Sequence, residues 1–139
     1  MAWDIVYYDP DDKSTSAVAF LDACPTNVES KLLAVLDAVA NAPPPQFSGG
    51  GMWEAMHGDM GGYYEVRTTG PNRELFRLFC ILENADEAAL AQRGLPGPAI
   101  AVITGMRKRW MTTFTEADYK RVRVMGETYR SLYPRRIVR

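Results

Sequence analysis

Two arginines lie in the middle of neighbouring strand-like segments, and a basic run follows a later strand. Arg67 lies within Gly62–Thr69, Arg77 lies within Arg73–Leu82, and the run is Arg107-Lys108-Arg109. Guanidinium groups stay charged and can bind two phosphate oxygens at once. If the fold brings these side chains together, they predict a site for a phosphate-containing ligand.

Side-chain alternation decides which of these residues share a face of a sheet. The two segments predict a hairpin around Gly70-Pro71-Asn72. If helices cover the more apolar face, Arg67 and Arg77 stand together on the open face, beside the basic run. The alternative is that Arg67 only forms an exposed ion pair across the hairpin, with Glu65 or Glu74. A register slip of one residue would turn both arginines to the other face.

Charge is distributed unevenly along the chain. From Pro98 onward ten Lys and Arg residues stand against three acids, whereas residues 1–97 hold six against fourteen. The net charge of −1 therefore hides a polarised molecule. Such asymmetry indicates a surface that meets an anion, for which nucleic acid is the commonest candidate.

The bulk composition is that of one ordinary globular domain spanning 1–139. No apolar run reaches the length of a membrane span, and the first residues lack the pattern of a secretory signal. Two distant cysteines, Cys24 and Cys80, and a single histidine, His57, argue against a protein-built zinc site. We therefore expect a cytoplasmic protein with reduced thiols, no metal and no cofactor.

Hydrophobic periodicity and turn residues define the elements. Strands are predicted at Trp3–Tyr8, Met52–Met56, Tyr63–Thr69, Arg73–Leu82 and Ala99–Thr104. Helices are predicted at Ser16–Cys24, from Thr26 to the prolines at 43–45, within Ala85–Ala91 and at Thr115–Tyr133. The second helix begins with a capping-box pattern, Thr26 to Glu29, and a loop is expected around Ser48–Gly51. This order predicts an α+β fold: a compact, mainly antiparallel sheet of four to five strands with helices packed on one face.

Four short motifs, in this order and spacing, give the chain a family resemblance. They are Phe20-Leu21-Asp22-Ala23-Cys24-Pro25, Tyr64-Glu65-Val66-Arg67, Leu75-Phe76-Arg77-Leu78-Phe79 and Ile103-Thr104-Gly105-Met106-Arg107-Lys108-Arg109. Together they resemble the phage-derived branch of the RelE/HigB toxins, in the RelE/ParE superfamily of type II toxin–antitoxin systems. The resemblance runs from about residue 16 to about residue 133. It implies a microbial-RNase-like fold and metal-free, ribosome-dependent mRNA endoribonuclease activity that inhibits translation.

The resemblance also assigns residue roles. The family's strand arginines correspond to Arg67 and Arg77, and its paired basic residues after the last strand correspond to Lys108 and Arg109. Arg107 lies at a variable position of that motif, and Met106 replaces a usual Phe. RNA-binding candidates are Arg73, Arg107, Trp110, Lys120 and Arg123. Trp110 suits base stacking, whereas the ordinary reading of the helical cations is a solvated face.

The proton-transfer group is less well defined. His57 has a suitable pKa range and is a candidate catalytic residue, but it also fits an exposed turn. Glu65 could act as a base if it lies on the open face, and the alternative is a structural ion pair with Arg67. Tyr63 or Tyr64 could donate a proton, although strand aromatics more often pack.

The resemblance further implies partners: a cognate antitoxin protein, the ribosome and mRNA, within a homodimer or a toxin–antitoxin hetero-oligomer. Two other functions stay open, a ParE-like inhibitor of DNA gyrase and a non-catalytic interaction protein of the same fold. The segment Asn84–Gly97 departs from the family pattern as an insertion, and its role is left open.

Overall fold

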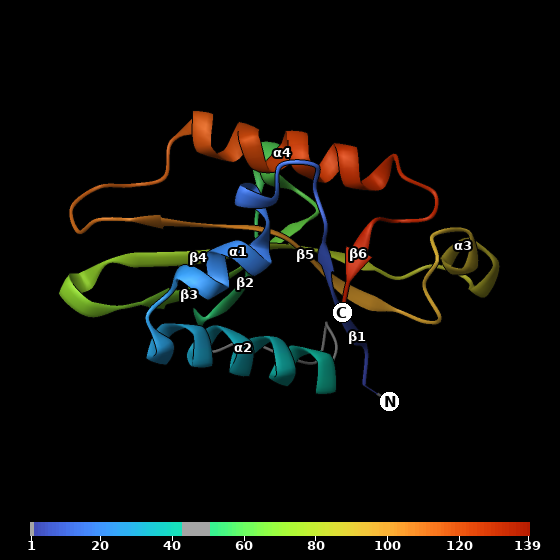
Figure 1. Cartoon of the computed structure of the whole chain (residues 1–139), viewed down its shortest axis with the longest axis horizontal. Helices are drawn as coiled ribbons and strands as arrows, with labels where there is room; N and C mark the ends of the chain where they lie inside the picture. The colour runs from blue at the N-terminus through green and yellow to red at the C-terminus, as the bar shows by residue number, and fades with distance from the viewer. Residues whose placement is uncertain (1, 43–50) are drawn as a thin grey trace.

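The computed structural model describes residues 2–42 and 51–139, which form a six-stranded sheet between helices (Figure 1). The strand order is β2-β3-β4-β5-β1-β6, and every neighbouring pair is antiparallel except β1 and β5. The strands are β1 (Asp4–Tyr8), β2 (Trp53–Ala55), β3 (Tyr63–Thr69), β4 (Leu75–Glu83), β5 (Ala99–Lys108) and β6 (Ile137–Val138). The predicted α+β class with a mainly antiparallel sheet is confirmed.

The helices cover both faces of the sheet, not one. They are α1 (Ala17–Ala23), α2 (Thr26–Asn41), α3 (Glu87–Gln92) and α4 (Glu116–Arg130). Buried side chains of α1 and α2 pack with Phe76 and Leu78, whereas α4 packs with Phe79 and Ile81 on the opposite face. Figure 1 shows α4 and α2 on opposite sides of the strands. Because β4 carries apolar residues on both faces, the sheet needs two covering layers.

Local sequence explains most helix ends. Ser16 caps α1 through its side chain, and Thr115 and Asp118 form a reciprocal capping box at the start of α4. The capping box expected at Thr26 does not form, since Pro25 is the N-cap of α2 and no side chain caps this helix. The expected stop of this helix at prolines 43–45, and most of the loop at Ser48–Gly51, fall in 43–50, outside the described residues.

Strand β5 is longer than expected, and this changes the meaning of the basic run. It continues to Lys108 and pairs with β4, with Met106 opposite Arg77 and Lys108 opposite Leu75. The first two residues of the basic run are therefore strand residues. Because side chains alternate along a strand, Arg107 and Lys108 point to opposite faces.

The turns that follow β3 and β5 lie at the same end of the molecule (Figure 1). Asn72, Arg73 and Met111 have positive φ angles of 58°, 58° and 68°, so both turns use left-handed backbone. The insertion, with α3, lies at the opposite end (Figure 1). None of the described helices is long and apolar enough to cross a membrane.

Candidate phosphate-binding site

Arg67 on β3 and Arg77 on β4 are direct cross-strand neighbours. Both extend from the face that α4 covers, because the preceding Val66 and Phe76 belong to the core under α1 and α2. The strand register thus pairs the two arginines on one face, as the sequence predicted. The expectation of an open face is wrong in part, since the Arg77 side chain is only 12% exposed.

Glu65 lies beside both arginines on the same face. One carboxylate oxygen is 3.5 Å from Nε of Arg67, and the other is 3.9 Å from Nε of Arg77. Burial raises the pKa of Glu65, although the charges of Arg77 and Arg67 oppose this rise. Arg67 also has a closer partner, Glu54 on β2, at 2.9 Å. Of the two partners in the alternative interpretation, Arg67 contacts Glu65, on its own strand, whereas Glu74 pairs with Arg107. Arg67 still lies next to Arg77.

An aromatic roof closes one side of the Arg77 guanidinium. Its carbon lies 5.6 Å from the centre of the Phe114 ring, and Phe114 in turn packs with Phe79 and Tyr119. Arg77 donates hydrogen bonds to the carbonyl oxygens of Phe76, at 3.0 Å, and Thr68, at 3.5 Å. Burial lowers the pKa of Arg77. These contacts fix the guanidinium in one orientation.

Tyr119 is the residue of this site that sequence reasoning missed. It is the fourth residue of α4, and its ring packs against Phe79 of the sheet. Burial and the Glu65 carboxylate raise the pKa of Tyr119. Its hydroxyl therefore stays protonated at neutral pH. The available signal was its position three residues before the buried Val122 on the same helix.

A hollow of about 290 Å³ opens beside the two arginines. Its lining comprises Gly51, Met52, Arg67, Thr68, Thr69 and Arg77. An anion in this hollow would meet both guanidinium groups at once. Thr69 lies two residues after Arg67 on β3 and so on the same face, where its hydroxyl adds a donor of the kind that phosphate oxygens accept.

The basic run is split between two faces. Lys108 lies on the face of Arg77 and pairs with Asp118 at 2.9 Å. Although burial opposes it, hydrogen bonds from Thr115 and Lys108 lower the pKa of Asp118 to about 2. Arg107 lies on the other face, bound to both oxygens of Glu74 at 2.6 and 2.8 Å. The expectation that Arg107 lies beside the arginine pair is therefore wrong. Because β5 continues to Lys108, side-chain alternation turns Arg107 to the other face.

Exposed residues of the two turns extend the site outward. The Arg73 guanidinium stacks over the Trp110 ring at 4.7 Å, and Trp110 is 55% exposed. Arg109 is exposed, and its backbone carbonyl accepts a hydrogen bond from the Thr112 hydroxyl. This tip presents a flat aromatic surface and cationic groups to solvent.

Three candidates from the sequence do not join the arginine pair. His57 is exposed and lies beyond the start of β3, since Met56 bonds to Tyr63, four residues or about 13 Å along the strand from Arg67. Lys120 is exposed on α4. Arg123 pairs with Glu116 at 2.5 Å and contacts the sulfur of Met60. The geometry thus places His57 away from the arginines, and Glu65 is the acid that lies within 4 Å of both guanidinium groups.

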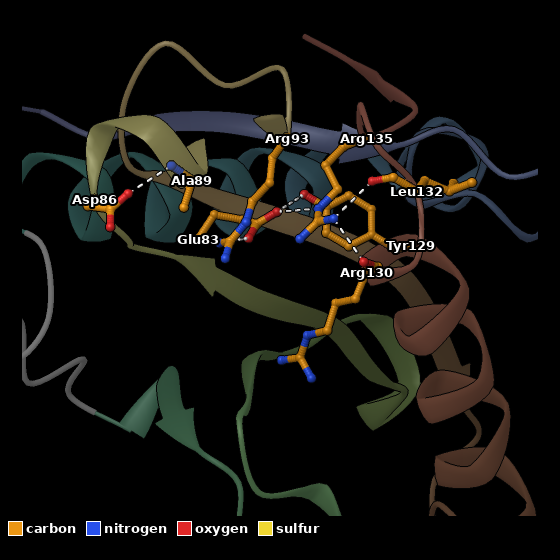
Figure 2. A network of polar contacts seen from close by, with 8 residues as sticks. All are labelled: Glu83, Asp86, Ala89, Arg93, Tyr129, Arg130, Leu132 and Arg135. Carbon is orange, nitrogen blue, oxygen red and sulfur yellow. Dashed lines mark hydrogen bonds and ion pairs between the residues drawn. The ribbon is translucent and has the colours of Figure 1, made fainter. Parts of the chain in front are cut away.

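A second acid–arginine cluster lies at the other end of the sheet, beside the insertion (Figure 2). The Glu83 carboxylate accepts hydrogen bonds from Arg93 at 2.9 Å, Arg135 at 2.8 Å and Tyr129 at 2.7 Å. Arg135 also donates to the carbonyls of Arg130 and Leu132. These bonds tie the insertion and the C-terminal segment to β4 and α4.

Among the described residues, no three His, Cys, Asp or Glu side chains gather as a metal site would require. Comparisons with protein-family models, curated proteins and solved structures found no match to this chain.

Proposed function

We propose that this protein is a metal-independent endoribonuclease that cleaves mRNA on the ribosome, as the toxin of a type II toxin–antitoxin system. The observation that carries the proposal is the half-buried Glu65 set beside two arginines that face each other across β3 and β4. The resemblance of the four sequence motifs to RelE/HigB toxins supports the same reaction.

Glu65 suits the role of general base. RNA cleavage without metal uses the 2′-hydroxyl as nucleophile, so a base must take its proton as the oxygen attacks phosphorus. A carboxylate with a raised pKa is a stronger base than an ordinary one, and burial raises the pKa of Glu65. The proton of the 2′-hydroxyl passes to Glu65, and the bond from phosphorus to the 5′-oxygen breaks. The products are a 2′,3′-cyclic phosphate and a 5′-hydroxyl end.

Arg67 and Arg77 suit the stabilisation of the charge that develops on the phosphate. Their guanidinium groups line one hollow, and hydrogen bonds and the Phe114 ring hold Arg77 in place before any substrate arrives. Preorganised donors of this kind typically supply about 3–4 kcal/mol of transition-state stabilisation each. Tyr119, protonated at neutral pH, suits the return of a proton to the leaving oxygen.

The exposed tip suits contact with RNA around the cleaved bond. Trp110 stacks against Arg73 and leaves more than half of its surface free, as base-stacking side chains do. The proposed partners are the ribosome, its mRNA and an antitoxin protein that blocks the toxin.

The test is tightly controlled expression in bacteria, followed by mapping of mRNA 5′ ends. Wild type is compared with Arg77→Ala, Lys108→Ala and Glu65→Gln, and with Arg139→Ala as a matched control. Arg139 pairs with Asp4 at the N-terminal end of β1 and lies outside the site. We expect codon-phased cuts with 5′-hydroxyl ends in wild type and Arg139→Ala, and their loss in Arg77→Ala, Lys108→Ala and Glu65→Gln.

Other outcomes point elsewhere. Growth arrest with DNA damage and intact mRNA would overturn the proposal in favour of gyrase inhibition. Cuts that persist at full strength in Glu65→Gln would remove Glu65 from the reaction. An absence of toxicity in all strains would leave a non-catalytic interaction protein.

A further inference from the structure

The second half of β5 has an edge that no described strand covers. β1 pairs with β5 only over Ala99–Val102, and the chain leaves the sheet at Asp9-Pro10. Over Gly105–Lys108, β4 is the one strand that pairs with β5 in the described chain. Figure 1 shows β5 running past β1, between α1 and α4. Alternate backbone N–H and C=O groups of this stretch point away from β4, toward an empty strand position.

A groove of about 390 Å³ lies along this edge. Its lining residues come from the segment before α1, from α1, from β5 and from α4: Ser14, Thr15, Ser16, Ala19, Phe20, Ala23, Thr104, Gly105, Met106, Arg107, Lys108, Arg121 and Met125. The α1 side is apolar, and Phe20 packs so closely over Gly105 that a Cβ there would clash with its ring. Ala19 and Ala23 line the groove on the same helix.

The groove carries more positive than negative charge. Its lining contains three cations, Arg107, Lys108 and Arg121, and no carboxylate, and Arg107 is paired with Glu74 outside the lining. Arg107 and Lys108 alternate on β5, and Arg121 is 69% exposed at the α4 side. Lys108 and Arg121 share a single acidic partner, Asp118, so this side keeps an excess of positive charge.

We propose that this groove binds an extended, acidic segment of a partner protein, which adds as a strand to the free edge of β5. A strand here would turn alternate side chains toward α1 and toward α4. Apolar side chains would fill the space beside Ala19 and Ala23, and acidic side chains would meet Lys108 and Arg121. RNA phosphates would pair with the cations, but RNA would form no strand hydrogen bonds with the β5 edge and would place no apolar side chains against α1. The inference stands independently of the proposed RNA cleavage.

The first test selects binders from a displayed library of random ten-residue peptides on the full-length protein. Ala23→Phe serves as the matched counter-selection target, because Ala23 is exposed on α1 and a phenyl ring there would fill the groove. We expect wild type to enrich peptides that alternate apolar and acidic residues, and Ala23→Phe to lose them. Enrichment of basic peptides, or equal enrichment on both proteins, would overturn the proposal.

The second test asks where and how a selected peptide binds. Backbone amides of Gly105–Lys108 should gain protection from hydrogen exchange when the peptide is present. Arg121→Glu should weaken binding at least about tenfold, whereas Lys120→Glu, the same charge change next to it but outside the groove, should change it less than about twofold. Protection confined to other strands would refute strand addition. If a single-stranded RNA oligonucleotide protects these amides and no selected peptide does, the groove is an RNA site instead.

Discussion

Two glutamates of this fold lie next to arginines beneath α4, yet their environments differ. Glu83 receives three hydrogen bonds of 2.7 to 2.9 Å, from Arg93, Arg135 and Tyr129. Against the effect of burial, the bonds from Arg135 and Tyr129 lower its pKa. This carboxylate is ionised, hydrogen-bonded through both oxygens and enclosed by its partners (Figure 2). Because three of its roughly four acceptor sites are taken and its side chain is only 3% exposed, it is poorly placed to take a proton from a substrate.

Glu65 has the same kinds of neighbour but weaker contacts. The Nε atoms of Arg67 and Arg77 lie 3.5 and 3.9 Å from its carboxylate oxygens, and Arg77 donates hydrogen bonds to backbone carbonyls instead. Burial therefore dominates and raises its pKa. Residue types alone do not separate a structural ion cluster from a reactive one. The number and length of the hydrogen bonds to the carboxylate do.

The largest expected effect comes from breaking the enclosed cluster. Arg135→Met removes a side chain that is 3% exposed and leaves Glu83 buried without its closest cation. We expect a loss of about 3–5 kcal/mol in the free energy of unfolding, measured by urea denaturation. Arg77→Met, the matched change in the other cluster, should cost only about 1–2 kcal/mol. Equal losses would mean that both clusters are structural.

The next effect is on the proposed RNA cleavage. Glu65→Gln keeps the shape of the side chain and removes its ability to accept a proton, so the cleavage rate should fall by about 10²–10⁴ while the protein stays folded. The rate is measured on ribosome-bound mRNA, and folding by circular dichroism. Arg139→Ala should cleave like wild type.

The pH profile of the proposed cleavage separates a catalytic role of Glu65 from a structural one, because a structural role would not set the pH at which the rate rises. A general base works when ionised, so the rate should rise with pH through the pKa of Glu65, which lies above the ordinary value of 4.5. Glu54→Gln removes a charge that raises this pKa and leaves the proposed catalytic groups in place, so the rise should then occur at lower pH. An unchanged midpoint in Glu54→Gln would contradict the assignment.

Smaller effects on stability follow from the opposite pKa shifts of Glu65 and Glu83. They are measured as the free energy of unfolding over a range of pH. The raised pKa of Glu65 means that its ionised form disfavours folding at pH 7, and this cost disappears as pH falls through that pKa. Glu65→Gln should therefore be more stable than wild type at pH 7, by less than about 1 kcal/mol, and lose this advantage in acid.

Glu83 should show the reverse. Its lowered pKa means that it stabilises the fold above its ordinary value of 4.5 and loses this contribution as pH falls through the folded-state pKa. Glu83→Gln should be less stable than wild type at pH 7, with a deficit that shrinks in acid. The same direction of change in both variants would refute the contrast between the clusters.

Local patterns predicted the four helices, strands β1 to β5 and the pairing of Arg67 with Arg77, because alternation and turn residues act over short distances. They missed the two-residue strand β6, the sixth of a sheet expected to have four to five. They did not predict that helices cover both faces, which depends on how β4 and β5 are buried from both sides. The distance of His57 from the two arginines also depends on a tertiary feature, the pairing of β2 with β3. Tyr119 reaches the β4 side chain Phe79 only because α4 packs on the sheet, a tertiary contact that no short motif encodes.

The smallest expected effect concerns Arg107, whose position differs most from the sequence-based expectation. It is a strand arginine like Arg77, but it faces α1, binds Glu74 and stacks over Phe76. Because it lies on the other face from Glu65, Arg107→Met should change the cleavage rate by less than about threefold and cost at most about 1 kcal/mol of stability. Lys108→Met, one residue further along β5, should reduce cleavage more strongly, since its side chain shares the face of Arg77. Both rates are measured on the same mRNA. A loss in Arg107→Met as large as that in Lys108→Met would show that RNA reaches around the edge of β5, and that charge along the run matters more than the face on which each side chain lies.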